Sequence, residues 1–372
     1  MSAIGLYLHI PFCARKCSYC DFPSWAGQME RREPYVKRLL EEMGERSREL
    51  GHPAVDTVYI GGGTPSLLMP GQMAALLQGV RDHFALTEGC EISCEANPGA
   101  LTDDMLDTLR RGDVNRLSLG AQSADPALLG LLGRQHSWPQ VEQAAARARA
   151  HGFDNLNIDL MLGIPGQTLE TWQRTLEAAL ALKPEHLSCY GLIPEEGTEL
   201  TGRIQSGELS LPEEAQERAM YDHTLQRLCE AGYIQYEISN FALPGHVCLH
   251  NMHCWQRQDY LGLGTAAHSL LGDERLVNPA DIDRYLAGDA PERELLTPQD
   301  KRFESLMLGL RMTRGVDLEA FEAMHGIALS SLWQEQMQPS LQAGLTELTG
   351  DGHFRLTRRG MDVMNAVLLD FL

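Results

Sequence analysis

The stretch CARKCSYCDF (residues 13–22) contains three cysteines, Cys13, Cys17 and Cys20, separated by three and by two residues. Closely spaced thiolates typically bind zinc or an iron–sulfur cluster. A structural zinc site requires four protein ligands, and the sequence contains no second pair of cysteines at the Cys-x-x-Cys spacing. In a cluster of four irons, three cysteines leave the fourth iron open to a small molecule. The stretch therefore favours an iron–sulfur cluster over zinc.

The cysteine stretch directly follows the first of six short apolar runs. These runs cover residues 5–10, 56–62, 91–97, 115–122, 156–163 and 186–193. Apolar residues at helical spacing lie between and after them, near 36–43, 73–84, 102–111, 140–151 and 169–182. Such a series predicts a parallel sheet with helices outside, and nearly continuous apolar strands are typical of sheets covered on both faces. Six units predict an α/β fold that forms an incomplete barrel, open on one side.

Polar or glycine-rich residues follow several of these runs. Residues 61–64 (GGGT), Glu95, Gln122 and Asp159 each stand at the end of a run. Because the carboxyl ends of barrel strands carry active sites, we expect these residues to meet the cysteine stretch at one edge. A carboxylate buried there needs a partner, which a cationic or hydroxyl-bearing ligand would provide. For the glycines, an ordinary loop between strand and helix is the alternative.

The alternation of strands and helices stops near residue 245. Residues 246–296 are rich in histidine, glycine and aromatic residues, and we expect loops and short strands that connect two larger units. Residues 297–372 predict helices and a hairpin near 350–352, as in a winged-helix-like domain. DNA binding is disfavoured, because acidic residues outnumber basic ones in this segment. We therefore predict a barrel over 1–245, the connecting segment, and a mainly helical C-terminal domain.

Charge and composition limit the classes of partner and the location. The formal net charge is -20, with 51 acidic and 31 basic residues, and such a surface repels the phosphates of nucleic acids. No apolar run is long enough to span a membrane, and the N-terminus lacks the features of a signal peptide. We expect a cytoplasmic protein without disulfides. It would reach a membrane only through a protein partner, because no basic amphipathic helix is evident.

The cysteine spacing and the motifs at the strand ends resemble those of the radical S-adenosylmethionine (SAM) superfamily. The motifs are GGGTP (61–65), EISCEANPG (91–99), RLSLGAQS (116–123), LLGRQH (131–136) and NIDLMLGIPGQT (157–168). They are most similar to its coproporphyrinogen oxidase-like branch. The resemblance implies a partial (β/α)6 TIM-like barrel with a [4Fe-4S] cluster on the three cysteines and SAM bound at the open iron.

The same resemblance implies which residues contact SAM. Tyr7 is similar to a SAM-contacting tyrosine on the first strand, and Glu95 to the carboxylate that receives the SAM ammonium group. Backbone N–H groups of the glycine turn would meet the amino-acid end of SAM. Arg134, taken without its motif, would be an ordinary surface arginine. The residues implied for the SAM site are Tyr7, Tyr19, Gly62, Gly63, Thr64, Glu95, Gln122, Arg134 and Asp159.

Two departures from the oxidase pattern favour the heme chaperones of this branch, the HemW type. Phe22 stands where the oxidases carry a further cysteine, and the sequence begins six residues before Tyr7, without the extension of the oxidases. We expect Phe22, together with Tyr19, to exclude water from the cluster. Residues 250–255 (HNMHCW) are similar to the chaperone motif His-Asn-x-x-Tyr-Trp, with Cys254 in place of tyrosine.

The chaperone resemblance implies that the chain binds heme and passes it to acceptor proteins of the respiratory chain. His250 is the implied heme residue, and Cys248, Met252, His253 and Cys254 are further ligands of the kind that heme iron accepts, or packing residues. The alternative function is that of an oxygen-independent coproporphyrinogen III oxidase, which abstracts hydrogen from a propionate side chain. A homodimer is compatible with either function.

Overall fold

A large open sheet forms the centre of the protein in the computed structural model, which describes residues 3–372. Its twelve strands run in the order β14-β13-β12-β11-β1-β4-β5-β6-β7-β8-β10-β9. Six neighbouring parallel strands in chain order are β1 (Ile4–Ile10), β4 (Ala54–Gly62), β5 (Ala85–Ala96), β6 (Arg116–Gln122), β7 (Leu156–Leu162) and β8 (His186–Gly191). The predicted partial barrel of six strands is therefore confirmed.

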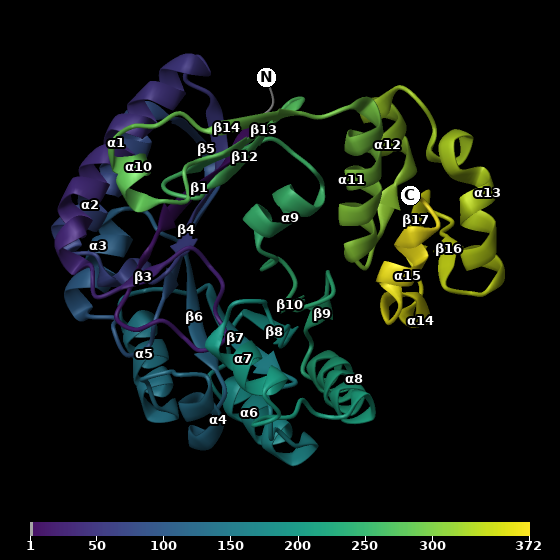
Figure 1. Ribbon diagram of the computed structural model, residues 1–372, viewed down its shortest axis with the longest axis horizontal. Coiled ribbons are helices and arrows are strands. Elements are labelled where there is room, and N and C mark those ends of the chain that lie inside the picture. Colours follow the sequence, from purple (N-terminus) through teal and green to yellow (C-terminus); the bar gives the residue numbers. More distant parts are fainter. Residues whose placement is uncertain (1–2) are drawn as a thin grey trace.

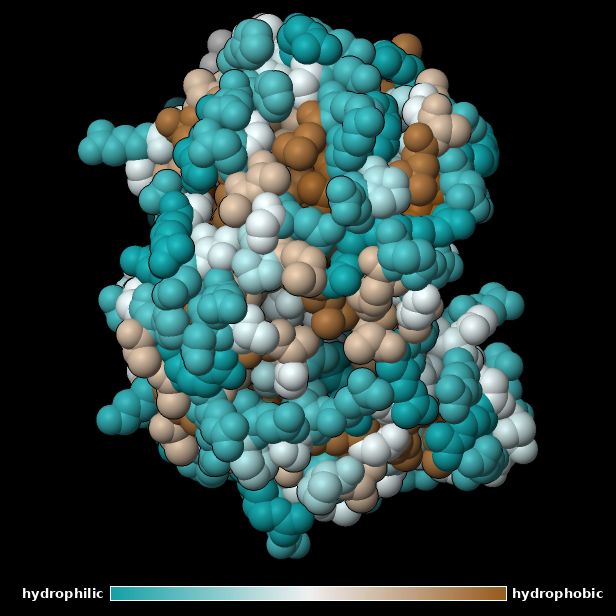
Figure 2. Space-filling view, turned by 90° about the vertical axis from the view of Figure 1, so that its left-hand side faces the viewer, coloured by the Kyte–Doolittle hydropathy of each residue, from teal (hydrophilic) through white to brown (hydrophobic). Residues whose placement is uncertain are grey.

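Helices cover the outside of these strands (Figure 1). The long ones are α1 (Arg32–Glu49), α2 (Pro70–His83), α3 (Asp103–Arg111), α5 (Trp138–Ala150), α6 (Leu169–Ala181) and α8 (Glu214–Glu230), and the short ones are α4 (Pro126–Leu131) and α7 (Glu199–Gln205). The predicted apolar stripes face the sheet: Leu39 of α1 and Leu76 of α2 are fully buried. The face formed mainly by α1, α2 and α3 is largely hydrophilic, with hydrophobic residues in small groups (Figure 2). Within residues 3–372, no helix is long and apolar enough to cross a membrane.

Residues 246–296 extend the sheet, rather than serving only as a connection. Strand β11 (Tyr260–Leu263) pairs in parallel with β1, and antiparallel strands continue outward as β12 (His268–Leu271), β13 (Glu274–Val277) and β14 (Glu292–Leu295). The free edge of a buried strand such as β1 needs a hydrogen-bonding partner, and β11 provides it. The segment also holds two helices that the sequence did not predict, α9 (Leu249–Trp255) and α10 (Ile282–Leu286). At the opposite edge, β10 (Asn240–Ala242) and β9 (Ile234–Gln235) follow β8.

The C-terminal residues form a second core of helices around a small sheet. Its elements are α11 (Pro298–Arg311), β15 (Val316–Asp317), α12 (Leu318–His325), α13 (Leu329–Gln342), β16 (Thr346–Leu348), β17 (His353–Leu356), α14 (Arg358–Met361) and α15 (Met364–Leu369). The hairpin predicted near 350–352 joins β16 to β17. Leu306, Leu310 and Phe354 are fully buried in this core. Helix α11 packs against α9, which lies between the sheet and the C-terminal unit (Figure 1).

The carboxyl ends of β1 and β4 approach each other through their backbones. The Gly63 N–H donates a hydrogen bond to the carbonyl oxygen of Ile10 over 2.8 Å. A Cβ atom on Gly63 would lie 2.8 Å from the Phe12 oxygen and 2.9 Å from the Ile10 oxygen, closer than carbon and oxygen can pack. Only glycine therefore allows the turn after β4 to lie against the segment that enters the cysteine stretch.

This contact predicts that Gly63→Ala destabilises the fold. The added methyl group must push two backbone segments apart, so we expect the free energy of unfolding to fall by about 1–3 kcal/mol. Denaturant titration of the purified variant measures the change. Gly71→Ala is the control, because a Cβ at Gly71 meets no atom within 4 Å and should cost nothing. Equal stability of the two variants would contradict the inferred close approach.

Candidate cluster and cofactor site

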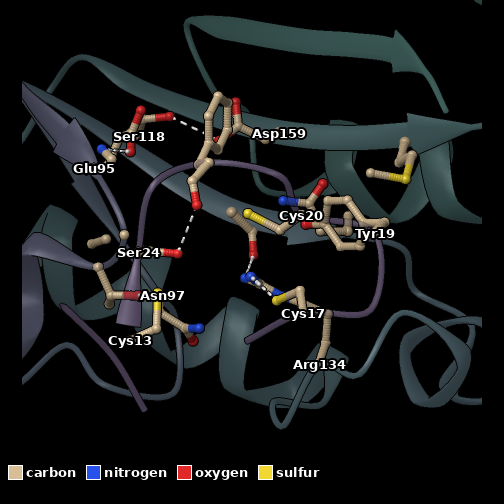
Figure 3. A pocket seen from close by; sticks show the side chains of 18 of the residues that line it. Cys13, Cys17, Tyr19, Cys20, Ser24, Glu95, Asn97, Ser118, Arg134 and Asp159 are labelled. Atoms are coloured by element: carbon tan, nitrogen blue, oxygen red, sulfur yellow. Dashed lines mark hydrogen bonds between the residues drawn. The ribbon is translucent and has the colours of Figure 1, made fainter. Parts of the chain in front are cut away.

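The three cysteines of the opening stretch gather at the carboxyl ends of the parallel strands. The loop that carries them leaves β2 (Phe12–Cys13) and returns as β3 (Trp25–Ala26), and these two short strands pair in parallel. The sulfur atoms of Cys13, Cys17 and Cys20 point toward one common space (Figure 3). All three side chains line a cavity of about 920 Å³ and are free thiols. Three soft ligands thus face a space large enough for a metal cluster and a small molecule.

The cysteine loop is anchored to the turn after α4. Ser18 donates from its backbone N–H to the Leu132 oxygen over 3.1 Å, and from its hydroxyl to the Leu131 oxygen over 2.8 Å. This docking brings Arg134, which follows the same turn, to Cys17, with Nη1 and Sγ 3.6 Å apart. Burial raises the pKa of the Cys20 thiol, and the nearby Lys16 ammonium opposes that shift.

The glycine turn forms the neighbouring wall of the cavity. Gly62 has φ +110°, a conformation that favours glycine, and a Cβ there would lie 2.5 Å from the ring of His9. The hydroxyl of Thr64 lies 3.9 Å from the Cys13 sulfur. The turn therefore presents backbone and a small hydroxyl to the cavity, where a larger side chain would fill the space.

Two half-buried carboxylates, Glu95 and Asp159, lie on the cavity wall. Glu95 accepts hydrogen bonds from the Tyr59 hydroxyl over 2.9 Å and from the Gly62 N–H over 3.1 Å. Burial, and then the nearby negative charge of Asp159, raise the pKa of Glu95 to about 7. Asp159 accepts from Ser118 over 3.0 Å (Figure 3). It also accepts from Asn157 over 2.6 Å, and burial raises the pKa of Asp159 as well. A pair of acids held this way is stabilised by a ligand with positive charge or hydroxyl groups.

Gln122 enters the cavity through an irregularity in strand β6. The pairing of β6 with β7 shifts register between Gly120 and Gln122, and Gln122 has φ +67°. Such bulges redirect side chains and are common next to active sites. The Gln122 side-chain oxygen accepts a hydrogen bond from the Tyr190 hydroxyl over 2.5 Å. The strained position is thus tied to the end of β8.

Most residues predicted for the site lie on the cavity wall. The structure brings together Cys13, Cys17, Tyr19, Cys20, Gly62, Gly63, Thr64, Glu95, Gln122, Arg134 and Asp159. Tyr7 is not among the described residues that line the cavity; its hydroxyl pairs with His9 Nδ1 over 2.9 Å, and its ring stacks on Tyr59. Phe22 was expected to exclude water, but its side chain is 61% exposed at the cavity rim.

The histidine motif lies in helix α9, which contributes one residue to the cavity wall. Glu91 accepts hydrogen bonds from the N–H groups of Leu249 over 2.9 Å and His250 over 3.3 Å, which holds the start of the helix. His250 itself is buried against the sheet: its Nδ1 pairs with the Thr57 hydroxyl over 3.0 Å, and its ring stacks on Tyr59. Burial lowers its pKa to about 3.

Asn251, rather than His250, is the motif residue that lines the cavity. Sequence reasoning also missed several polar lining residues, among them Ser118, Ser188 and Arg311. The two serines lie inside apolar strands, and the sequence singles out neither side chain, although Ser118 belongs to the RLSLGAQS motif. Arg311 ends helix α11, far along the chain from every other motif. Only the packing of α11 against α9 brings it to the site.

Known proteins show the same combination of elements. Residues 7–179 match the radical SAM superfamily, and residues 296–363 match the HemN C-terminal domain. The heme chaperone HemW of Bacillus subtilis is 36% identical over 98% of each chain, and that of Escherichia coli is 36% identical over 99% of this chain and 98% of its own. The structure of coproporphyrinogen III oxidase (HemN) from Escherichia coli, a radical SAM enzyme, superimposes with a TM-score of 0.87 at 25% identity, over 99% of this chain and 90% of that chain. This chain belongs to the HemW family within the radical SAM superfamily.

Proposed function

We propose that this protein is a heme chaperone, which binds heme and transfers it to acceptor proteins of the respiratory chain. The observation that carries the proposal is that the three cysteines and Asn251 of α9 line one and the same cavity. The curated relatives that match over nearly the full chain are named heme chaperones. Phe22, at the position of the further oxidase cysteine, supports a chaperone over an oxidase.

The cavity residues suit a [4Fe-4S] cluster and SAM, the groups that the radical SAM family implies. Cys13, Cys17 and Cys20 would hold three irons, and the group would supply an open iron and an electron when bound. Glu95 would receive the SAM ammonium group, because it is a half-buried carboxylate on the cavity wall without a cationic partner in hydrogen-bond range among the described residues. Arg134, between Cys17 and the Gly120 oxygen, would attract the SAM carboxylate.

His250 is the residue that we propose for heme binding on α9. The low pKa keeps its imidazole neutral at physiological pH, as ligation of iron requires. Its Nδ1 pairs with Thr57 and its ring stacks on Tyr59, so the contacts of α9 with strand β4 orient the ring. Any contact of this ring with a heme in the cavity requires α9 to shift from the sheet.

The first experiment tests heme delivery against porphyrin chemistry. Anaerobically reconstituted protein is loaded with hemin and mixed with a heme-free b-type cytochrome, and absorbance follows the transfer. We expect transfer to the cytochrome, and no protoporphyrinogen when coproporphyrinogen III, SAM and a reductant are supplied instead. We also expect His250→Ala to weaken hemin binding, while the exposed His268→Ala does not. Formation of protoporphyrinogen would establish the oxidase activity in place of the chaperone function.

A further prediction concerns the three cysteines proposed as cluster ligands. Cys20→Ser removes one of three thiolates that converge on the cavity, so the cluster absorbance and most of the iron should be lost. Cys229→Ser is the matched control, because Cys229 is an exposed cysteine on α8 and should leave the iron content unchanged. Iron analysis of anaerobically purified protein measures both variants. A site with one zinc and no iron would refute the cluster assignment.

Another prediction concerns Glu95. Because its pKa is about 7, the charge that would attract the SAM ammonium group changes near neutral pH, and SAM binding should depend on pH. The carboxyl group loses its proton as the pH rises through 7, so wild-type protein should bind SAM more tightly at pH 8 than at pH 6. Glu95→Gln should bind SAM about tenfold more weakly at pH 8 and show little pH dependence. Equilibrium dialysis measures the affinities, with the exposed Glu88→Gln on the same strand as control.

The pH dependence of folding stability tests the raised pKa of Glu95 independently of SAM binding. The pKa of Glu95 is higher in the folded protein than its ordinary value of 4.5. Its contribution to stability is therefore fully present below pH 4.5 and is lost as the pH rises through about 7. Without SAM, Glu95→Gln should gain stability relative to the wild type between pH 6 and pH 8 in thermal unfolding. An unchanged difference over this interval would show that Glu95 is already ionised.

A further inference from the structure

Arg311 of helix α11 reaches the cavity at the end that faces α9. Its Nε atom donates to Oε2 of Glu237 over 3.0 Å, and Glu237 is fully buried. The guanidinium carbon lies 4.5 Å from the centre of the Trp255 ring, in a cation–π contact. The side chain is 31% exposed and lines the cavity. Two fixed contacts thus orient a cation toward an open space.

Much of the hydrogen-bonding capacity of this guanidinium remains unused. The arginine side chain carries five N–H donors, and within residues 3–372 the only hydrogen bond that the Arg311 side chain donates to the protein uses Nε. Asn251 also lines the cavity and precedes Trp255, the ring that Arg311 contacts, by one turn of α9. Asn240 of β10 also lines the cavity and is 8% exposed, and its side-chain NH2 group is a hydrogen-bond donor. A cation and two amides therefore offer polar contacts to a ligand here.

The other cations of the cavity wall lie in the cysteine loop or contact it. Arg15 and Lys16 belong to the cysteine loop, and the Lys16 ammonium donates to the Phe22 oxygen and the Ser24 hydroxyl. Arg134 donates to Cys17 and to the Gly120 oxygen. Arg311 is thus the cation that the described part of the chain places at the α9 end of the cavity. A ligand with negative charge at that end would meet Arg311 first.

Exposed apolar side chains at the rim of the cavity indicate that this ligand also has an apolar part. Phe22 and Ile193 line the mouth and are 61% and 69% exposed. Large apolar side chains at a cavity rim favour an apolar ligand, while a planar guanidinium binds carboxylates through two parallel hydrogen bonds. A tetrapyrrole with propionate side chains combines an apolar ring with carboxylates.

We propose that Arg311, Asn251 and Asn240 form a subsite for a propionate carboxylate of the tetrapyrrole ligand. The proposal rests on the heme-binding function proposed above and names the part of the ligand that the C-terminal unit recognises. Trp255 and Glu237 are positioning residues, because they hold the Arg311 guanidinium in place. Arg257 of the segment after α9 also pairs with Glu304 of α11 over 3.0 Å. The subsite therefore exists only while α11 and α9 are packed together.

The test compares hemin with hemin dimethyl ester, in which both propionates are neutral. Wild-type protein should bind hemin about 10- to 100-fold more tightly than the ester in the same detergent buffer. Arg311→Gln should lose most of this preference by weakening hemin binding alone, while Arg311→Lys should retain part of it. Absorbance titration gives all affinities, and the iron content reports that the cysteine end of the cavity is intact.

Two further variants keep the test decisive if Arg311→Gln fails to fold. Asn251→Asp places a negative charge at the subsite, so it should weaken hemin binding and leave the ester unaffected. Arg314→Gln is the matched control, because the Arg314 side chain is 73% exposed, and its hemin preference should equal that of the wild type. Equal binding of hemin and ester by wild-type protein would overturn the subsite but leave heme binding standing. Binding of neither would overturn the heme-binding function as well.

Discussion

The parallel pairing of β1 with β4 is the interaction on which the site depends. It places the end of β1, which leads into the cysteine loop, beside the glycine turn after β4. Gly63 then approaches the Ile10 and Phe12 carbonyl groups at distances that exclude a side chain. Because both segments are fixed by backbone contacts, the three thiols and the backbone cradle face the same space. One strand pair thus positions both the three thiols and the glycine turn at the cavity.

Helix α9 packs between strand β4 of the large sheet and helix α11 of the C-terminal unit. Glu91 of β5 holds its N-terminus, and Thr57 of β4 orients His250. From the other side, α11 contacts it through the Arg311 guanidinium on the Trp255 ring. This helix of seven residues therefore contacts both the large sheet and the C-terminal unit. Within one motif, Asn251 lines the cavity and Trp255 contacts Arg311 of the C-terminal unit.

Local pattern was enough to predict the strands and the main helices. Apolar runs such as residues 5–10 are buried on both faces, and helical stripes such as Val36, Leu39 and Met43 face the sheet, so hydrophobic burial alone decided their form. The motif segment 250–255 was not recognised as a helix. Its stability depends on Glu91 and on packing between two units, which are interactions distant in sequence. The pairing of β11 with β1 likewise joins segments about 250 residues apart.

The sequence by itself determined the chemistry of the site. Three cysteines at fixed spacing, a glycine turn and acids at strand ends can be read directly, because each depends on residue type and local position. Only the tertiary structure decided which side chains face the cavity. Within one motif, Asn251 lines the cavity while His250 packs against Tyr59, since neighbouring residues of a helix point in different directions. Arg311 reaches the cavity only because α11 packs on α9, a contact that no local pattern encodes.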